Sequence, residues 1–155
     1  MKNRCIKSVL FICATLLFCA CEQVDDIVNN VQRISGPSCC TTSKDVSWNG
    51  NIVNLYKAGS TISFVSKVSG TLSFYYETEY SYNCLQVKQN GHIVYYNSNS
   101  DRAKVVIHNV QAGDKFRFVN KDDDYYYEDH YDIWVDNIII TAGNGNNSNN
   151  PGFDF

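Results

Sequence analysis

Residues 70–76 read Gly-Thr-Leu-Ser-Phe-Tyr-Tyr, and apolar and polar side chains alternate along most of this stretch. Successive side chains of a β-strand point to opposite faces of its sheet, so the alternation predicts a strand with one buried face. Tyr75 and Tyr76 are adjacent, and only one of these two rings can face the core. The same alternation returns at residues 61–65.

Strand-like segments recur about every ten residues between residues 46 and 141, and turn-forming residues separate them. Asn90-Gly91 is such a turn, because these residues favour the backbone of a tight hairpin. Residues 133–140 read Ile-Trp-Val-Asp-Asn-Ile-Ile-Ile, a nearly continuous apolar strand. Without a sustained helical period, this pattern predicts an all-β fold, an antiparallel β-sandwich over residues 46–142.

The first 20 residues have the composition of a secretory leader. Lys2, Arg4 and Lys7 precede an apolar run over residues 9–20. This run is too short to cross a bilayer, which needs about 20 apolar residues. We therefore predict a signal peptide over residues 1–20.

Cys21 follows residues 16–20, Leu-Leu-Phe-Cys-Ala, and a small residue directly before a cysteine at this point resembles a bacterial lipobox. The resemblance implies cleavage before Cys21, acylation of its thiol and new amino group, and membrane attachment through the acyl chains. It also implies a lipid-anchored protein of the outer membrane or cell surface. The alternative is an ordinary cleaved leader that leaves Cys21 unmodified.

Two segments outside the sandwich are predicted to be a tether and a tail. Residues 21–45 are polar and mixed, and apolar residues recur in them at the spacing of an amphipathic helix that residues 35–38 would end. These apolar residues are Val24, Ile27, Val28, Val31 and Ile34. Residues 143–155 are rich in asparagine and glycine, so they bury too little surface to offset their ordering entropy and are predicted to be disordered.

The chain has seven cysteines, and three remain once the leader and Cys21 are set aside: Cys39, Cys40 and Cys84. An odd number of thiols in an oxidising compartment leaves one over. The simplest arrangement is a disulfide from Cys84 to Cys39 or Cys40. A bond between the adjacent pair is the second option, and a metal site, without the usual C-x₂-C spacing, is the weakest.

Four segments of the predicted sandwich together resemble a known group of secreted modules. They are the strand at 70–76, the Leu-Gln-Val strand at 85–87, the turn and aromatic strand at 113–116, and the closing strand at 132–138. Their order is similar to that in MAM-like, concanavalin-like and choice-of-anchor domains of bacterial surface proteins. The resemblance implies a jelly roll that serves adhesion, carbohydrate contact or support of a neighbouring domain, and is seldom catalytic.

Acidic residues crowd the segment 122–132. Such dense negative charge repels itself unless water or a cation neutralises it, and Ca²⁺ prefers about six to eight oxygen ligands. The spacing does not follow an EF-hand loop. The segment is therefore either a hydrated acidic loop or a calcium site, as is common in modules of the resembled group. The candidate calcium ligands are Asp122, Asp124, Glu128, Asp129 and Asp132.

Tyrosine is the most informative residue type, with 11 copies in the chain, most of them near three turns. An exposed tyrosine presents a flat apolar ring and a hydroxyl at low entropy cost, which suits sugar rings or protein partners. The alternative is that these tyrosines are half-buried strand formers at a sheet rim. The predicted contact patch consists of Tyr75, Tyr80, Tyr82, Tyr125, Tyr126 and Tyr127.

Charge and motifs argue against nucleic-acid binding and catalysis. A net charge of −3, from 13 basic and 16 acidic residues, provides no broad basic field for phosphates. The three histidines lack metal spacing, no G-x-S-x-G motif occurs, and Glu77 and Glu79 lack the third acid of laminarinase-like enzymes. We therefore predict a non-catalytic cell-surface lipoprotein that contacts glycans or surface polymers. The alternative is a structural or adhesion lipoprotein that docks on a partner protein.

Overall fold

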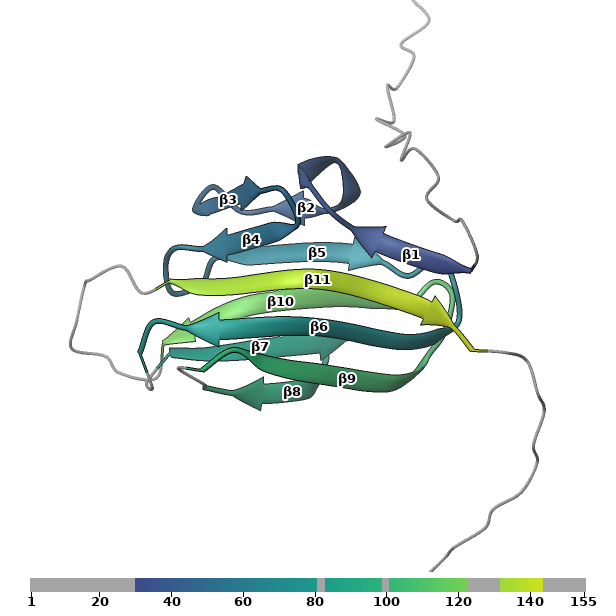
Figure 1. Cartoon of the computed structure of the whole chain (residues 1–155). Coiled ribbons are helices and arrows are strands. Elements are labelled where there is room, and N and C mark those ends of the chain that lie inside the picture. Colours follow the sequence, from purple (N-terminus) through teal and green to yellow (C-terminus); the bar gives the residue numbers. More distant parts are fainter. Residues whose placement is uncertain (1–29, 81–82, 99–100, 123–131, 144–155) are drawn as a thin grey trace, which may run out of the picture.

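Two antiparallel β-sheets face each other in the computed structural model, which describes residues 30–80, 83–98, 101–122 and 132–143 (Figure 1). In this part of the chain, no helix is long and apolar enough to cross a membrane. The predicted signal peptide, Cys21 and the tail after residue 143 lie outside the described residues.

Sheet A is the six-stranded sheet, and β11 (Ile133–Ala142) runs through its middle. Its order is β3 (Val46–Asn49), β4 (Ile52–Leu55), β11, β6 (Gly70–Thr78) and β9 (Ala103–Val110). A further strand, β1 (Val31–Ile34), pairs with the second half of β11, while β4 pairs with the first half. The two short strands thus share one edge of β11.

Sheet B has five strands in the order β2 (Thr41–Thr42), β5 (Thr61–Val65), β10 (Lys115–Asp122), β7 (Asn83–Gln89) and β8 (His92–Asn97). From β4 onward the chain repeatedly crosses between the sheets, since β6, β9 and β11 belong to sheet A. Together these sheets form an all-β, antiparallel jelly-roll sandwich, which confirms the predicted fold class.

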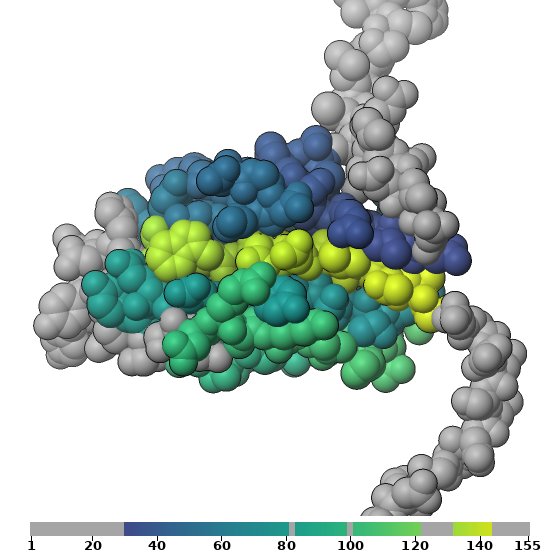
Figure 2. Space-filling model, in the orientation of Figure 1, coloured from purple at the N-terminus to yellow at the C-terminus, as the bar shows by residue number. Residues whose placement is uncertain are grey.

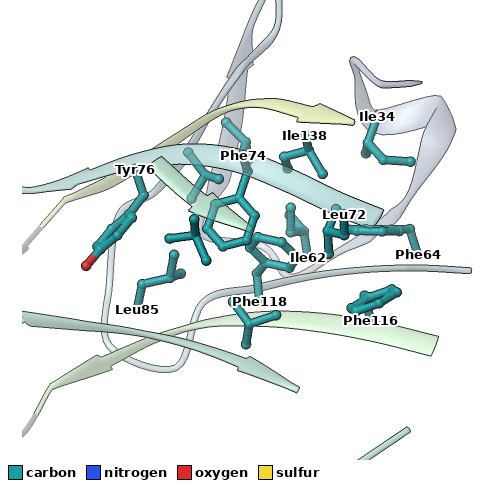
Figure 3. Close-up of a cluster of buried hydrophobic side chains, with 14 of the residues drawn as sticks. Ile34, Ile62, Phe64, Leu72, Phe74, Tyr76, Leu85, Phe116, Phe118 and Ile138 are labelled. Atoms are coloured by element: carbon teal, nitrogen blue, oxygen red, sulfur yellow. The ribbon is translucent and has the colours of Figure 1, made fainter. Parts of the chain in front are cut away.

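The core lies between the sheets and is built by the predicted alternation (Figure 3). Leu72, Phe74 and Tyr76 on β6 point inward, and each is at most 1% exposed. Phe74 meets Phe118 of sheet B with ring centroids 4.8 Å apart in an edge-to-face arrangement. Full burial of each such side chain contributes about 2 kcal/mol, so these facing rings hold the two sheets together.

The predicted hairpin turn joins β7 to β8. Asn90 and Gly91 have φ angles of 51° and 88°, and the strands leave them in opposite directions. Both angles are in the left-handed region, which asparagine and glycine adopt at little cost. The hairpin prediction is therefore confirmed.

The prediction that residues 21–45 form a tether containing an amphipathic helix is wrong for the part that the structure describes. Residues 31–34 are strand β1, and Thr41 and Thr42 form β2 on sheet B. Ile34 is 1% exposed and belongs to the core. The sequence did not indicate this strand because Gln32 is a polar residue with a buried side chain. The side chain donates from Nε2 to the Val65 carbonyl at 3.0 Å and accepts from the Lys67 amide at 2.7 Å.

The predicted disulfide from Cys84 to Cys39 or Cys40 is not formed. Cys40 directly precedes β2, whereas Cys84 lies on β7, and two strands separate β2 from β7. Three strand spacings of about 4.8 Å give roughly 14 Å, and a disulfide needs Cα atoms within about 7 Å. All three residues are present as thiols.

Candidate functional site

A cleft of about 560 Å³ opens at one end of the sandwich, where connections between strands gather. Four parts of the chain line it. Lys44 and Asp45 come from the β2–β3 connection, Tyr56 and Lys57 from the β4–β5 connection, and Glu79 follows β6, while Asp132 directly precedes β11. In Figure 1 this is the end at which β4 and β6 finish and β11 begins. The cleft is therefore an assembly that only the folded sandwich creates.

A buried asparagine on sheet B fixes the connection that carries Tyr56 and Lys57. Asn120, fully buried on β10, donates from Nδ2 to the Leu55 carbonyl at 2.8 Å. Its backbone accepts from the Gly59 amide at 2.7 Å and donates to the Ser60 carbonyl at 3.0 Å. Because both ends of the β4–β5 connection are bonded to this one residue, the cleft wall has a fixed position.

Tyr56 is held by two hydrogen bonds and still presents its ring to solvent. Its amide donates to the Asp45 carbonyl at 3.2 Å, and its hydroxyl lies 2.5 Å from the Ser47 hydroxyl. The residue remains 39% exposed. A ring held in this way loses little entropy on binding a ligand.

Two acidic residues of the cleft, Glu79 and Asp132, bond to each other through their backbones and the Glu79 carboxylate. The Glu79 amide donates to the Asp132 carbonyl at 3.0 Å, and the Asp132 amide donates to Glu79 Oε2 at 3.3 Å. Asn54 on β4 donates from Nδ2 to Asp132 Oδ2 at 3.0 Å. These bonds set the direction of both carboxylates and leave acceptor capacity on each.

The cleft combines three carboxylates, two ammonium groups and one phenol ring. Carboxylates accept hydrogen bonds from hydroxyl groups, ammonium groups donate them, and an exposed ring packs against an apolar surface. Such a set suits a polar, hydroxyl-rich ligand with at least one apolar face. Among the described residues, no group of three or more His, Cys, Asp or Glu side chains could hold a metal ion.

Only part of the predicted tyrosine patch lies in the described residues. Tyr80 follows Glu79 of the cleft and is 44% exposed, and its carbonyl accepts a hydrogen bond from Thr78 Oγ1 at 3.0 Å. Tyr82, Tyr125, Tyr126 and Tyr127 lie outside the described residues. Tyr75 is on β6, on the outer face of sheet A, which Figure 2 shows from outside.

Tyr75 is capped by a cation instead of presenting an open ring. The Arg102 guanidinium carbon lies 4.0 Å from its ring centroid, and Lys104 Nζ lies 5.8 Å away. Arg102 also forms a bidentate ion pair with Asp136, with Nη2 to Oδ1 at 2.9 Å and Nε to Oδ2 at 3.1 Å. This hydrogen bonding raises the pKa of Arg102. The cluster occupies one ring face of Tyr75, which leaves Tyr80 as the described member of the patch beside the cleft.

The predicted calcium ligands are largely outside the described residues as well. Asp124, Glu128 and Asp129 fall there, and for Asp122 only the backbone is described, as the last residue of β10. Asp132 is described, and it lies in the cleft with a hydrogen bond from Asn54.

Lys44, Asp45, Tyr56 and Lys57 belong to the cleft but are absent from the predicted site. Tyr56 is the one that the sequence signals, because an aromatic residue directly before a Lys-Ala-Gly-Ser turn is expected at a loop rim. The others are common surface residues with no distinctive spacing.

Among known proteins, similarity to this chain is found in solved structures and not in family models or curated sequences. No protein-family model matches the chain. No curated protein sequence matches it either. Similar solved structures exist, and those described below share less than 25% sequence identity with this chain, so their likeness establishes the fold and nothing further.

One similar structure is the CBM36-1 domain of a multidomain xylanase from the hindgut metagenome of Trinervitermes trinervoides. It has 16% identity and a TM-score of 0.51, and the match covers 74% of this chain and 98% of that domain. The family two carbohydrate esterase from Cellvibrio japonicus matches at 11% identity and a TM-score of 0.56, over 73% of this chain and 33% of the esterase.

The secreted serine protease VesC from Vibrio cholerae matches at 19% identity and a TM-score of 0.54, over 63% of this chain. The match spans only 23% of the protease. The Agl-KA catalytic domain is also similar, and the match spans 28% of that chain. The chain thus has a jelly-roll fold similar to that of the CBM36-1 domain, and a similar fold forms part of the larger VesC protease and of the carbohydrate esterase.

Proposed function

We propose that this chain is a non-catalytic lipoprotein of the outer membrane or cell surface whose jelly-roll sandwich binds a glycan in the loop-end cleft. The cleft carries the proposal, because it brings the exposed ring of Tyr56 together with the hydrogen-bonded carboxylates of Glu79 and Asp132. The fold that it shares with a carbohydrate-binding module supports the same ligand class.

Each group of the cleft has a counterpart on a sugar. The apolar face of a pyranose ring packs on the Tyr56 ring, and its hydroxyl groups donate to Glu79 and Asp132. Lys44 and Lys57, which also line the cleft, supply donors to sugar oxygens. Both carboxylates already accept a hydrogen bond from a neighbouring group, which supports a binding role over a catalytic one.

The location follows from the leader. A positively charged start, a short apolar run and a small residue before Cys21 support export and acylation of that cysteine. Several acyl chains would anchor the sandwich firmly, since each buried CH₂ contributes about 0.8 kcal/mol.

Calcium is proposed as a structural ligand of the acidic segment 122–132, whose last residue, Asp132, borders the cleft. A cation that binds only the folded state raises the melting temperature. Thermal unfolding in about 1 mM Ca²⁺ and in excess chelator therefore tests the calcium proposal. Equal melting temperatures would exclude a structural calcium ion.

One observation favours the second candidate, an adhesion lipoprotein that docks on a partner protein. Strand β8 is an edge strand of sheet B, and its Ile93, Val94 and Tyr96 are 57%, 40% and 43% exposed. Exposed apolar edges accept an added strand from another chain.

A glycan array separates the two candidates. The mature chain is applied as wild type, as Tyr56→Ala and as Tyr56→Phe. The proposal expects wild-type binding to a limited set of glycans, loss of at least about tenfold with Tyr56→Ala, and retention with Tyr56→Phe, which keeps the ring. A blank array with wild-type protein that melts cooperatively would contradict glycan binding and leave the docking candidate.

A further inference from the structure

The outward face of sheet B carries a row of cations, although the chain as a whole has a net charge of −3. On β10, Lys115, Arg117 and Lys121 are exposed, and the positions between them include the buried Phe116, Phe118 and Asn120. Val119, the outward position between Arg117 and Lys121, is 9% exposed and interrupts the row. The three cations therefore point away from the core on the same face. At about 3.4 Å per residue they extend over roughly 20 Å along the strand.

A fourth cation widens the row on the neighbouring strand. Lys88 of β7 lies directly opposite Arg117 in the strand register. Like charges at directly opposed positions destabilise a sheet, and an intervening carboxylate would normally relieve the repulsion. In the part of the chain that the structure describes, neither Lys88 nor Arg117 forms an ion pair, in contrast to Arg102, which pairs with Asp136 on sheet A.

Apolar side chains border the row on both sides. The strand order places β10 and β7 in the middle, with β5 on one side and β8 on the other. Val65 of β5 is opposite Lys115 and is 50% exposed, and Ile93 of β8 is opposite Lys88 and is 57% exposed. Tyr96 of β8, opposite Gln86, is 43% exposed. The face is a basic stripe between two apolar margins.

We propose that this stripe binds an anionic polysaccharide, a linear glycan that carries carboxylate or sulfate groups. The inference rests on the proposed glycan-binding function and adds its ligand class and a second contact surface. A row of about 20 Å matches an extended polymer better than a single phosphate or headgroup. The margins suit the apolar faces of sugar rings, with Tyr96 as the aromatic contact.

Binding of polygalacturonate tests the proposal, with heparin as the sulfated probe and dextran as the neutral one. Affinity electrophoresis or calorimetry is carried out with the mature wild-type chain, Arg117→Glu and Lys104→Glu. Lys104→Glu is the matched control, because it makes the same change of charge at an exposed position on the opposite sheet. We expect Arg117→Glu to weaken polygalacturonate binding at least about tenfold, and the control to stay within about twofold of wild type.

The repulsion between Arg117 and Lys88 makes Arg117→Glu a mild substitution for folding, and thermal melting checks this. A second variant, the double substitution Arg117→Gln and Lys88→Gln, removes both positive charges and introduces no negative charge. Wild-type binding must also weaken as salt rises, because screening acts on exposed charges. An affinity unchanged in these variants would overturn the inference.

Other outcomes distinguish the two proposals. Binding of neutral glycans that depends on Tyr56, without polygalacturonate or heparin binding, would overturn the stripe and leave the cleft proposal intact. Binding to phosphatidylglycerol vesicles or single-stranded DNA in place of both acidic polysaccharides would overturn the stripe's assigned ligand. Failure to bind any glycan would overturn both.

Discussion

The hydroxyl groups of Tyr76 and Tyr95 lie 2.8 Å apart and join the two sheets by a side-chain hydrogen bond. Tyr76 comes from β6 of sheet A and is 1% exposed, and Tyr95 comes from β8 of sheet B. Their rings meet edge to face, with centroids 5.7 Å apart. Burial, together with this hydrogen bond, raises the pKa of the Tyr76 phenol. The pair is a polar contact between the two sheets.

Tyr76→Phe and Tyr95→Phe are each expected to lower the free energy of unfolding by about 1 kcal/mol, because each leaves a hydroxyl group without its partner. The double variant should lower the free energy of unfolding by no more than about the larger of the two single changes, because both hydroxyl groups are then absent. Chemical denaturation of the four proteins measures this cycle. Strictly additive losses would show that the two hydroxyls do not interact.

Asp114 connects the turn before β10 with the β7–β8 hairpin. Its carboxylate accepts from the Gln111 amide at 2.7 Å, from Asn90 Nδ2 at 2.7 Å and from Gln89 Nε2 at 2.6 Å. The Gln111 bond, followed by that of Asn90, lowers the pKa of Asp114. The charged carboxylate therefore stabilises the folded state more than the unfolded one.

Asp114→Asn is expected to lower the free energy of unfolding by about 2 kcal/mol at neutral pH, because an amide cannot accept all three bonds. The folded pKa lies below the unfolded value of about 3.9, so the contribution is fully present above that value. It is lost as the pH falls through the folded pKa. Urea denaturation of both proteins from pH 7 to pH 2 should show the difference shrinking below about pH 4. A constant difference would contradict this account.

Gly70 is required by the close approach of the last strand. A Cβ atom at this position would lie 2.6 Å from the Gly143 amide nitrogen and 2.8 Å from Ala142 Cα. Gly70→Ala is expected to destabilise the protein by about 2 kcal/mol or more, since backbone atoms must shift. Gly36→Ala is the control, because a Cβ there meets nothing within 4 Å. Equal melting temperatures of the two variants would contradict the register of β6 and β11.

Much of the fold can be predicted from local patterns, and the exceptions have physical causes. The alternation of residues 70–76 and the Asn90-Gly91 hairpin are local signals, and the structure confirms both. Strand β1 escapes the pattern because Gln32 is a polar residue at an inward position, where bonds to the distant Val65 and Lys67 satisfy it. The burial of the Gln32 side chain depends on hydrogen-bond partners more than 30 residues away in the sequence, which a local pattern does not contain.

The candidate site is less predictable, because four separate connections build it. Asp132 and Tyr80 have sequence signals, whereas Asp45 and Lys57 gain their role only when the strands bring them together. Tyr75 illustrates the reverse case: its position on an outward face is predictable, but its capping by Arg102, 27 positions later, is not. Long-range contacts decide which exposed ring remains open.

A separate prediction concerns the export of the chain and the acylation of Cys21. With a clickable palmitate analogue in a bacterial host that processes lipoproteins, the wild-type protein should be labelled and should fractionate with membranes. Cys21→Ala should lose both properties, because the acyl chains supply the attachment. Cys19→Ala, two positions upstream, is the control and should keep both. A labelled Cys21→Ala variant, or an unlabelled wild type, would show that Cys21 is not the acylated residue.

The most direct test of the central claim is a titration of the ¹⁵N-labelled mature chain with the strongest oligosaccharide from the glycan array, followed by amide NMR shifts. The account predicts that the largest shifts cluster at Asp45, Tyr56, Lys57, Glu79 and Asp132, which line one cleft. Saturable shifts confined to residues away from the loop end, or no shifts at all, would contradict glycan binding in the cleft.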